Sequence, residues 1–139
     1  MYLKFMILKS KISKSFNIEY FFAKMVNLKM DFDEYQKEAL KTDLKTSING
    51  NYLIYPVLGL ADETGEVVGK FKKLYRDRAG VIDEEYKTEI LKELGDVLWY
   101  MTVICDRLGV KLSDVAEKNI EKLSSRKMRN AIHGNGDNR

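Results

Sequence analysis

The sequence predicts an all-α fold in which four helices form an antiparallel bundle. Apolar side chains recur with a period near 3.6 residues over most of the chain, and loops of about 4–8 residues separate the periodic segments. The 139 residues include one proline and are 45% apolar, which is typical of a single helical domain with a modest core. Because short loops join antiparallel neighbours, we expect one bundle over residues 30–130.

Residues 1–29 differ in charge from the rest of the chain. They carry six lysines against one acidic residue, a net charge of +5, whereas residues 30–139 carry 18 basic and 20 acidic residues, a net charge of −2. This segment lacks a sustained helical or strand period, so we expect a leader or upstream extension outside the fold, with the functional protein beginning near Met30. The alternative is an additional helix that packs on the domain. Since the basic charge belongs to the leader, no nucleic-acid partner is expected.

The first helix is expected from Asp31 to about Lys45. Asp31 suits the N-cap position, because its carboxylate can accept a hydrogen bond from a free backbone N–H of the first turn. The amphipathic pattern of this helix comprises Phe32, Tyr35, Gln36, Ala39 and Leu40. A loop over residues 46–51 follows, marked by the turn-forming pair Asn49 and Gly50.

The second and third helices have clear boundaries in the sequence. The second is expected to start within residues 52–56, since Pro56 is tolerated in a first turn, and to run to about Arg76. Residues 77–83 form the next connection. The third helix is expected from Glu84 to Leu108, because Gly109 suits the position that follows a helix C-terminus.

The fourth helix is expected to begin within residues 111–113 and to end near Arg129. Its apolar positions are Val115, Ala116, Ile120 and Leu123. Residues 131–139 are polar and rich in glycine, so we expect a flexible tail.

Cysteine use and hydropathy restrict the cellular setting. Cys105 is the one cysteine of the chain and falls on a predicted apolar face, so we expect neither a disulfide framework nor a cysteine metal cluster, and a reducing, cytoplasmic location. No apolar run approaches the ~18 residues of a membrane span, and residues 5–8 are too short for a secretory signal core. We therefore expect no membrane association.

Two acidic pairs, Glu63/Glu66 and Glu93/Asp96, carry the functional argument. Each pair has helical i,i+3 spacing, and Glu63 and Glu93 lie at the edges of the apolar stripes of their helices. Both helices therefore direct carboxylates to the seam where they pack. No basic residue on the same helices is placed to neutralise all four, and converging carboxylates repel one another. A hard divalent cation with oxygen ligands would remove that repulsion, and Mg²⁺ is the usual ion where phosphates complete the coordination.

Several other kinds of site are excluded. A di-iron bundle and a nucleophilic triad both require histidine, and His133, the one histidine, lies in the tail. Gly59, Gly65 and Gly69 lie inside a helical pattern and match no phosphate-binding loop. We expect these glycines to allow close helix packing or close approach of a ligand.

Basic residues cluster on two helices, and two interpretations stay open. They are Lys70, Lys72, Lys73 and Arg76 late in the second helix, and Lys118, Lys122, Arg126 and Arg129 on one side of the fourth. In one interpretation they form a solvated face and interact with helix dipoles. In the other, one or two of them contact the phosphates of a metal-bound nucleotide.

Taken together, these residues resemble the MazG-type nucleotide pyrophosphohydrolases. The similarity lies in residues 58–67 (LGLADETGEV), Lys72 with Lys73, and residues 89–100 (EILKELGDVLWY). That family carries Glu-x-x-Glu followed after a gap by Glu-x-x-Asp, the pattern of the two acidic pairs. Asn119, Lys122 and Arg126 also resemble its fourth-helix pattern, so the similarity spans roughly residues 32–129.

The resemblance implies an all-α enzyme that hydrolyses a nucleoside triphosphate to the monophosphate and pyrophosphate with Mg²⁺, or Mn²⁺ as a substitute, in nucleotide-pool house-cleaning. It implies a homodimer or homotetramer. Trp99, Tyr100 and Val103, which the helix stripes carry beyond the main core face, also predict self-association. The implied catalytic and metal residues are Glu63, Glu66, Glu93 and Asp96. The implied substrate contacts are Lys73, Asn119, Lys122 and Arg126 at the phosphates, with Tyr35 and Gln36 at the base.

Three alternatives remain open at this point. Within the superfamily, the chain could be a dedicated dUTP or dCTP hydrolase or a phosphoribosyl-ATP pyrophosphohydrolase. Outside it, a non-catalytic helical module would use the same carboxylates to bind a structural ion or a partner subunit. The sequence contains no base-reading motif that separates the nucleotide substrates.

Overall fold

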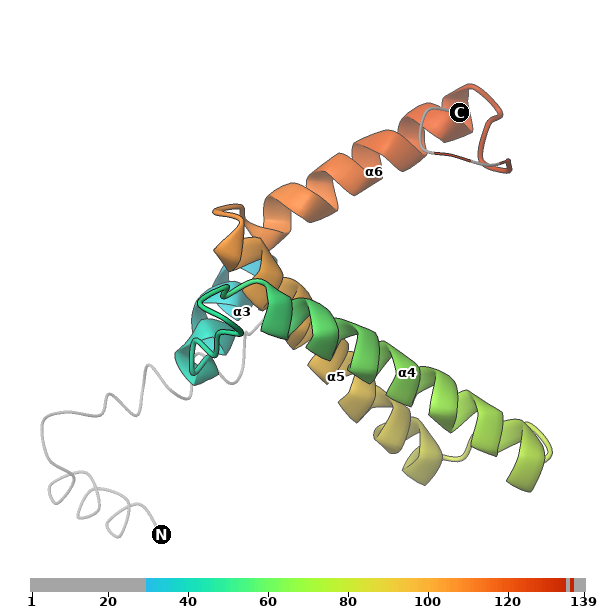
Figure 1. Ribbon diagram of the computed structural model, residues 1–139. Helices are drawn as coiled ribbons and strands as arrows, with labels where there is room; N and C mark the ends of the chain where they lie inside the picture. Colours follow the sequence, from blue (N-terminus) through green and yellow to red (C-terminus); the bar gives the residue numbers. More distant parts are fainter. Residues whose placement is uncertain (1–29, 135, 137–139) are drawn as a thin grey trace, which may run out of the picture. The chain divides into compact units, whose positions relative to one another are not determined.

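The computed structural model describes residues 30–134 and residue 136 (Figure 1). The elements are α3 (Phe32–Ala39), the 3₁₀ helix η1 (Leu40–Thr42), α4 (Ile54–Asp77), α5 (Glu84–Arg107) and α6 (Leu112–Met128). Within these residues the extended structure is limited to one isolated bridge between Ile48 and Asn51. The all-α fold and its four helices are confirmed. The expected leader, residues 1–29, lies outside the described residues.

Helix α3 begins as expected but ends earlier. Asp31 is the N-cap, and its Oδ1 accepts a hydrogen bond from the backbone N–H of Glu34 at 2.8 Å. The expected end near Lys45 is wrong, because η1 stops at Thr42 and Lys45 has a left-handed φ of 53°. Asp43 is turned out of the helix into an extended conformation, where its carboxylate pairs with Arg107 of α5. The helical segment therefore ends where Asp43 forms its ion pair with Arg107.

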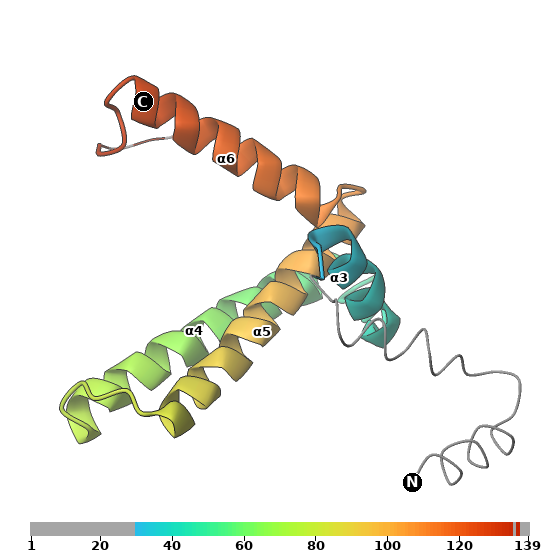
Figure 2. The ribbon, with the colours of Figure 1, turned by 180° about the vertical axis from the view of Figure 1, so that it is seen from behind.

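Helices α4 and α5 form an antiparallel hairpin, and both views show them side by side (Figures 1 and 2). Asp83 caps α5 by accepting a hydrogen bond from the backbone N–H of Tyr86 at 2.8 Å. Leu74, Tyr86 and Ile90 form the buried cluster near the turn, and the hydroxyl of Tyr86 donates to the carbonyl oxygen of Lys70. This contact fixes the backbone of α4 against α5.

Helix α6 starts after Gly109, whose φ of 67° ends α5 in the expected way. The N–H group of its first residue is satisfied from α3, because the backbone N–H of Leu112 donates to Oε1 of Gln36 at 2.7 Å. Lys111 and Ser113 add contacts to Asp33, with 2.7 Å between Lys111 Nζ and Asp33 Oδ2. Helix α6 contacts α3 and α5, and in both views it leads away from α4 (Figures 1 and 2).

The packing leaves much apolar surface open. Leu74 is 1% exposed, and Cys105 is buried as expected. The expectation that Val103 lies outside the core, where it would support self-association, is wrong, because this side chain is only 2% exposed. Large apolar side chains on the three long helices are nevertheless more than 40% exposed, among them Val68, Phe71, Leu91, Leu94, Ile120 and Leu123. The expected antiparallel packing is thus realised between α4 and α5, while α6 leaves this pair. Among the described residues, no helix combines the length and apolar character that crossing a membrane requires.

Candidate metal and nucleotide site

Three carboxylates converge at the seam of the hairpin. Glu63 projects from α4, and Glu93 and Asp96 project from one face of α5, one helical turn apart. One carboxylate oxygen from each side chain lies within 4.8 Å of the other two. Glu63 and Glu93 are half-buried and Asp96 is exposed, so the cluster opens to solvent on one side.

The electrostatics of this cluster favour a cation. Burial, followed by the negative charges of Asp96, Glu66, Asp62 and Glu93, raises the pKa of the Glu63 carboxyl. The donors are all carboxylate oxygens, which suit hard divalent ions such as Mg²⁺ and Mn²⁺ better than soft metals. The residues present therefore fit the metal that the sequence predicts.

Lys70 of α4 reaches into the same seam. Its Nζ lies 3.0 Å from Glu89 Oε2 and 3.4 Å from Glu93 Oε1 on α5. The hydrogen bond with Glu89 is the main cause that raises the pKa of Lys70 and lowers the pKa of Glu89. The pair joins side chains on two different helices, so the arrangement of charges along either helix alone does not predict it. The i,i+7 spacing of Glu63 and Lys70 on α4 was the available signal, since it places both side chains on the face that meets α5.

Glu66 takes a different position from its three predicted partners. It is exposed and lies outside the group whose oxygens are within 4.8 Å. It lines an open hollow of about 370 Å³ on α4, together with Lys70 and Lys73. Lys73, predicted to contact phosphate, is thus placed near Glu66 at the edge of the candidate site.

Aromatic side chains lie next to the carboxylates. Tyr35 of α3 is near Asp96, and burial followed by the Asp96 charge raises the pKa of the Tyr35 hydroxyl. Tyr100 contacts Trp99 edge-to-face at 4.9 Å and Tyr55 at 6.4 Å between ring centroids. Burial is the main cause that raises the pKa of Tyr100, with smaller effects from Tyr55 and from the Glu63 charge. Sequence reasoning proposed Tyr35 here but missed Tyr55 and Tyr100.

Gly59 explains how the Tyr100 ring fits against α4. A Cβ atom at Gly59 would lie 2.2 Å from ring carbons of Tyr100, which is impossible without a shift. The expectation of close helix packing is therefore met at Gly59. At Gly65 and Gly69 an added Cβ would meet nothing within 4 Å, so helix packing does not require glycine at either position.

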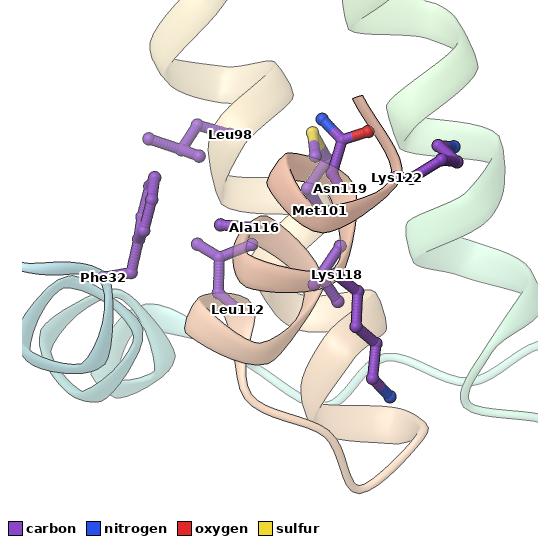
Figure 3. Close-up of a pocket in the computed structure, with 9 residues that line it drawn as sticks. Phe32, Leu98, Met101, Leu112, Ala116, Lys118, Asn119 and Lys122 are labelled. Atoms are coloured by element: carbon purple, nitrogen blue, oxygen red, sulfur yellow. The ribbon is translucent and has the colours of Figure 1, made fainter. Parts of the chain in front are cut away.

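The other predicted substrate contacts have distinct surroundings. Both ends of the Gln36 amide bind backbone at the start of α6, through Leu112 N and Val110 O, which makes this side chain a helix cap. Asn119 and Lys122 line an apolar groove of about 600 Å³ with residues of α3 and α5 (Figure 3). Arg126 is 6% exposed and donates to the carbonyl oxygen of Gly136 at 3.4 Å. The residues lining this groove include none of the three clustered carboxylates.

Comparison with known proteins agrees with this geometry. The sequence model of the MazG nucleotide pyrophosphohydrolase domain matches residues 56–129, more than half of the chain. The chain is 47% identical to the "Gene 37 protein" of Mycobacterium phage L5 over 93 residues, which are 67% of this chain and 80% of that protein. It is 33% identical to the "Uncharacterized protein YvdC" of Bacillus subtilis (strain 168) over 72 residues, 48% of this chain and 68% of that protein. No solved structure gives a significant match. The matched residues include the clustered carboxylates and Lys70, and the chain therefore belongs to the MazG nucleotide pyrophosphohydrolase domain family.

Proposed function

We propose that the protein is a Mg²⁺-dependent nucleoside triphosphate pyrophosphohydrolase, which converts a (d)NTP and water to the (d)NMP and pyrophosphate. The observation that carries this proposal is the convergence of Glu63, Glu93 and Asp96 in a chain of the MazG family. Mn²⁺ would substitute for Mg²⁺, because both accept hard oxygen ligands. The cellular role we propose is removal of unwanted nucleotides from the pool.

Each residue of the site has a proposed task. Glu63, Glu93 and Asp96, assisted by Glu66, would hold the divalent cation that binds the triphosphate. When bound, the cation neutralises phosphate oxygens and lowers the pKa of the attacking water. The proton of that water passes to a carboxylate oxygen that the cation does not fully engage, on Glu63 or Glu66.

The substrate contacts follow the same arrangement. Lys73 lies beside Glu66 on the open side of α4, where it would contact a phosphate. Asn119, Lys122 and Arg126 of α6 are further proposed phosphate contacts. Tyr35 is the proposed contact to the base, since it already lies near Asp96. Gln36 would contribute indirectly, by holding the start of α6.

Self-association is part of the proposal. Phe71 on α4, Leu94 on α5 and Leu123 on α6 are each more than 40% exposed in one chain. Monomers rarely leave so many large apolar side chains open, so a second copy, in a homodimer or homotetramer, would cover them.

The test is product analysis with purified protein and a panel of canonical and damaged (d)NTPs, with Mg²⁺ and with chelator. We expect Mg²⁺-dependent formation of pyrophosphate and monophosphate in equal amounts. Orthophosphate as the product would contradict the reaction. If folded, metal-loaded protein turns over neither these nucleotides nor phosphoribosyl-ATP, the non-catalytic module is the correct interpretation.

A further inference from the structure

The carboxylate seam already contains a cation that belongs to the chain. Lys70 Nζ lies between Glu89 at 3.0 Å and Glu93 at 3.4 Å, and its side chain is only 21% exposed. Glu93 is even less accessible, at 15%. The position of Lys70 is further held because its carbonyl oxygen accepts the hydroxyl hydrogen bond of Tyr86. The ammonium is thus a built feature of the site rather than a mobile surface charge.

Glu93 can pair with two cations, the ammonium of Lys70 and a divalent metal ion. One of its oxygens contacts Lys70, and Glu93 is also one of the three carboxylates that converge with Glu63 and Asp96. An ammonium and a divalent ion that share one half-buried carboxylate repel each other, and the low local dielectric strengthens that repulsion. Glu89 offers the ammonium a second partner, which lies nearer than Glu93 and outside the group of three.

We propose that Lys70 is the internal counter-cation of the metal site: it neutralises Glu93 in the metal-free protein and withdraws to Glu89 when a divalent ion takes Glu93. This inference rests on the metal site of the proposed function. It makes Lys70 a positioning residue that sets the affinity for metal, and it makes Glu89 the residue that draws Lys70 away from Glu93. Glu93 then has a neighbouring cation with or without bound metal.

Substitutions on the two sides of the Lys70–Glu89 pair have opposite effects in this scheme. Lys70→Met removes the competitor, and we expect Mn²⁺ to bind about tenfold tighter. Glu89→Gln leaves Glu93 as the only charged partner of Lys70 within the part of the chain that the structure describes, and we expect Mn²⁺ to bind about threefold weaker. In the double variant, Glu89→Gln should change the Mn²⁺ affinity little beyond the effect of Lys70→Met, because Glu89 affects metal binding only through Lys70.

Titration of the 139-residue protein with Mn²⁺ alone, followed by electron paramagnetic resonance or calorimetry, measures these affinities without any turnover. Lys87→Met is the matched control, because Lys87 also pairs with a glutamate of the same hairpin, Glu84, at 3.4 Å. Both partners of that pair are more than half exposed, so we expect an unchanged Mn²⁺ affinity. Lys70→Arg keeps the charge and should stay within about threefold of wild type.

Thermal unfolding distinguishes a counter-cation of the metal site from a salt bridge of Lys70 that only stabilises the hairpin. In chelator we expect Lys70→Met to lower Tm, since Glu93 and Glu89 lose their neutralising partner, and saturating Mn²⁺ should restore most of the loss. A structural bridge would lose the same stability with and without Mn²⁺.

Unchanged or weaker Mn²⁺ binding by Lys70→Met overturns the inference. Unchanged or tighter Mn²⁺ binding by Glu89→Gln also overturns it. Because Glu89→Gln is a conservative substitution, this measurement remains available if Lys70→Met does not fold. Absence of Mn²⁺ binding by the wild-type protein overturns the metal site as well. Normal Mn²⁺ binding with no turnover of any nucleotide would overturn the proposed function while leaving the role of Lys70 intact.

Discussion

The carboxylate of Asp43 pairs with the guanidinium of Arg107, and this pair joins the segment after η1 to the end of α5. The two side chains are 7% and 12% exposed, and Arg107 also binds its neighbour Asp106. The hydrogen bond to Asp43 is the main cause that raises the pKa of Arg107. The pair ties the segment that follows α3 and η1 to α5, the helix that carries Asp96 near Tyr35 of α3.

Replacing Asp43 tests the importance of this pair. Asp43→Asn leaves the charge of Arg107 half-buried without its main partner, and we expect a loss of about 3 kcal/mol in the free energy of unfolding. Urea unfolding monitored by circular dichroism measures it. Asp77→Asn is the control, because the pair of Asp77 with Arg76 is exposed to solvent and should contribute much less to stability. Equal effects of the two substitutions would contradict the assignment.

The contact between Gly59 and Tyr100 gives a second prediction. Gly59→Ala forces the Tyr100 ring away from α4, and we expect a loss of about 1–3 kcal/mol and a changed near-ultraviolet circular dichroism spectrum. Gly65→Ala is the matched control on the same helix, where the new methyl group meets open space. There we expect a gain of up to about 1 kcal/mol from helix propensity. A stabilising Gly59→Ala would show that the ring is not held against α4.

Glu93 tests the catalytic assignment. Glu93→Gln keeps the size of the side chain but removes a charged metal ligand, and we expect kcat to fall by about a hundredfold or more while the helices remain folded. The measurement is Mg²⁺-dependent release of pyrophosphate, with circular dichroism as the test of folding. Glu85→Gln, at an exposed position in the first turn of α5, is the control and should retain full activity. Activity of Glu93→Gln within a few-fold of wild type would contradict the assignment.

The raised pKa of Glu63 makes the metal-free protein sensitive to pH. The folded state holds the Glu63 proton more tightly than the unfolded state, so the ionised carboxylate destabilises the fold once pH exceeds the raised pKa. In chelator we therefore expect Glu63→Gln to have a higher Tm than wild type at pH 7.5. The difference should shrink as pH falls through the folded pKa of Glu63 toward its ordinary value.

Thermal scans of both proteins in chelator between pH 4.5 and 7.5 provide this comparison. Glu121→Gln, at an exposed position on α6, is the control and should not change Tm with the same pH dependence. A wild-type protein more stable than Glu63→Gln at pH 7.5 without metal would show that the carboxylates do not repel one another in the fold.

The exposed apolar side chains predict the oligomeric state. Leu94 of α5 is 45% exposed although it belongs to an apolar stripe, and Leu94→Lys should disrupt the interface that covers it. Light scattering after gel filtration should show a dimer or tetramer for wild type and a smaller species for the variant. Leu44→Lys is the control, since Leu44 lies outside the helices, is 90% exposed and should not alter the assembly. A monomeric wild-type protein at micromolar concentration would contradict the prediction.

The sequence alone determined the features that depend on short separations along the chain. The 3.6-residue period located the helices, Asp31 marked the cap of α3, and Gly109 marked the end of α5. The i,i+3 spacing of Glu93 and Asp96 placed both carboxylates on one helix face, which the structure shows. These signals are readable because caps and helix faces are set by residues within about one turn.

Contacts between distant segments depend on how the helices pack, which cannot be read from local sequence. Asp43 and Arg107 are 64 residues apart, and their ion pair forms where η1 ends. Gln36 and Leu112 are 76 residues apart, and their hydrogen bond caps the start of α6. The antiparallel packing of α4 on α5 likewise brought Lys70 to Glu93 and left Glu66 outside the group of three carboxylates. Periodicity defines which residues share a helix face, but the axial shift and rotation of one helix against another depend on packing of the whole interface. That packing, rather than any local motif, selected which charged side chains meet in the seam.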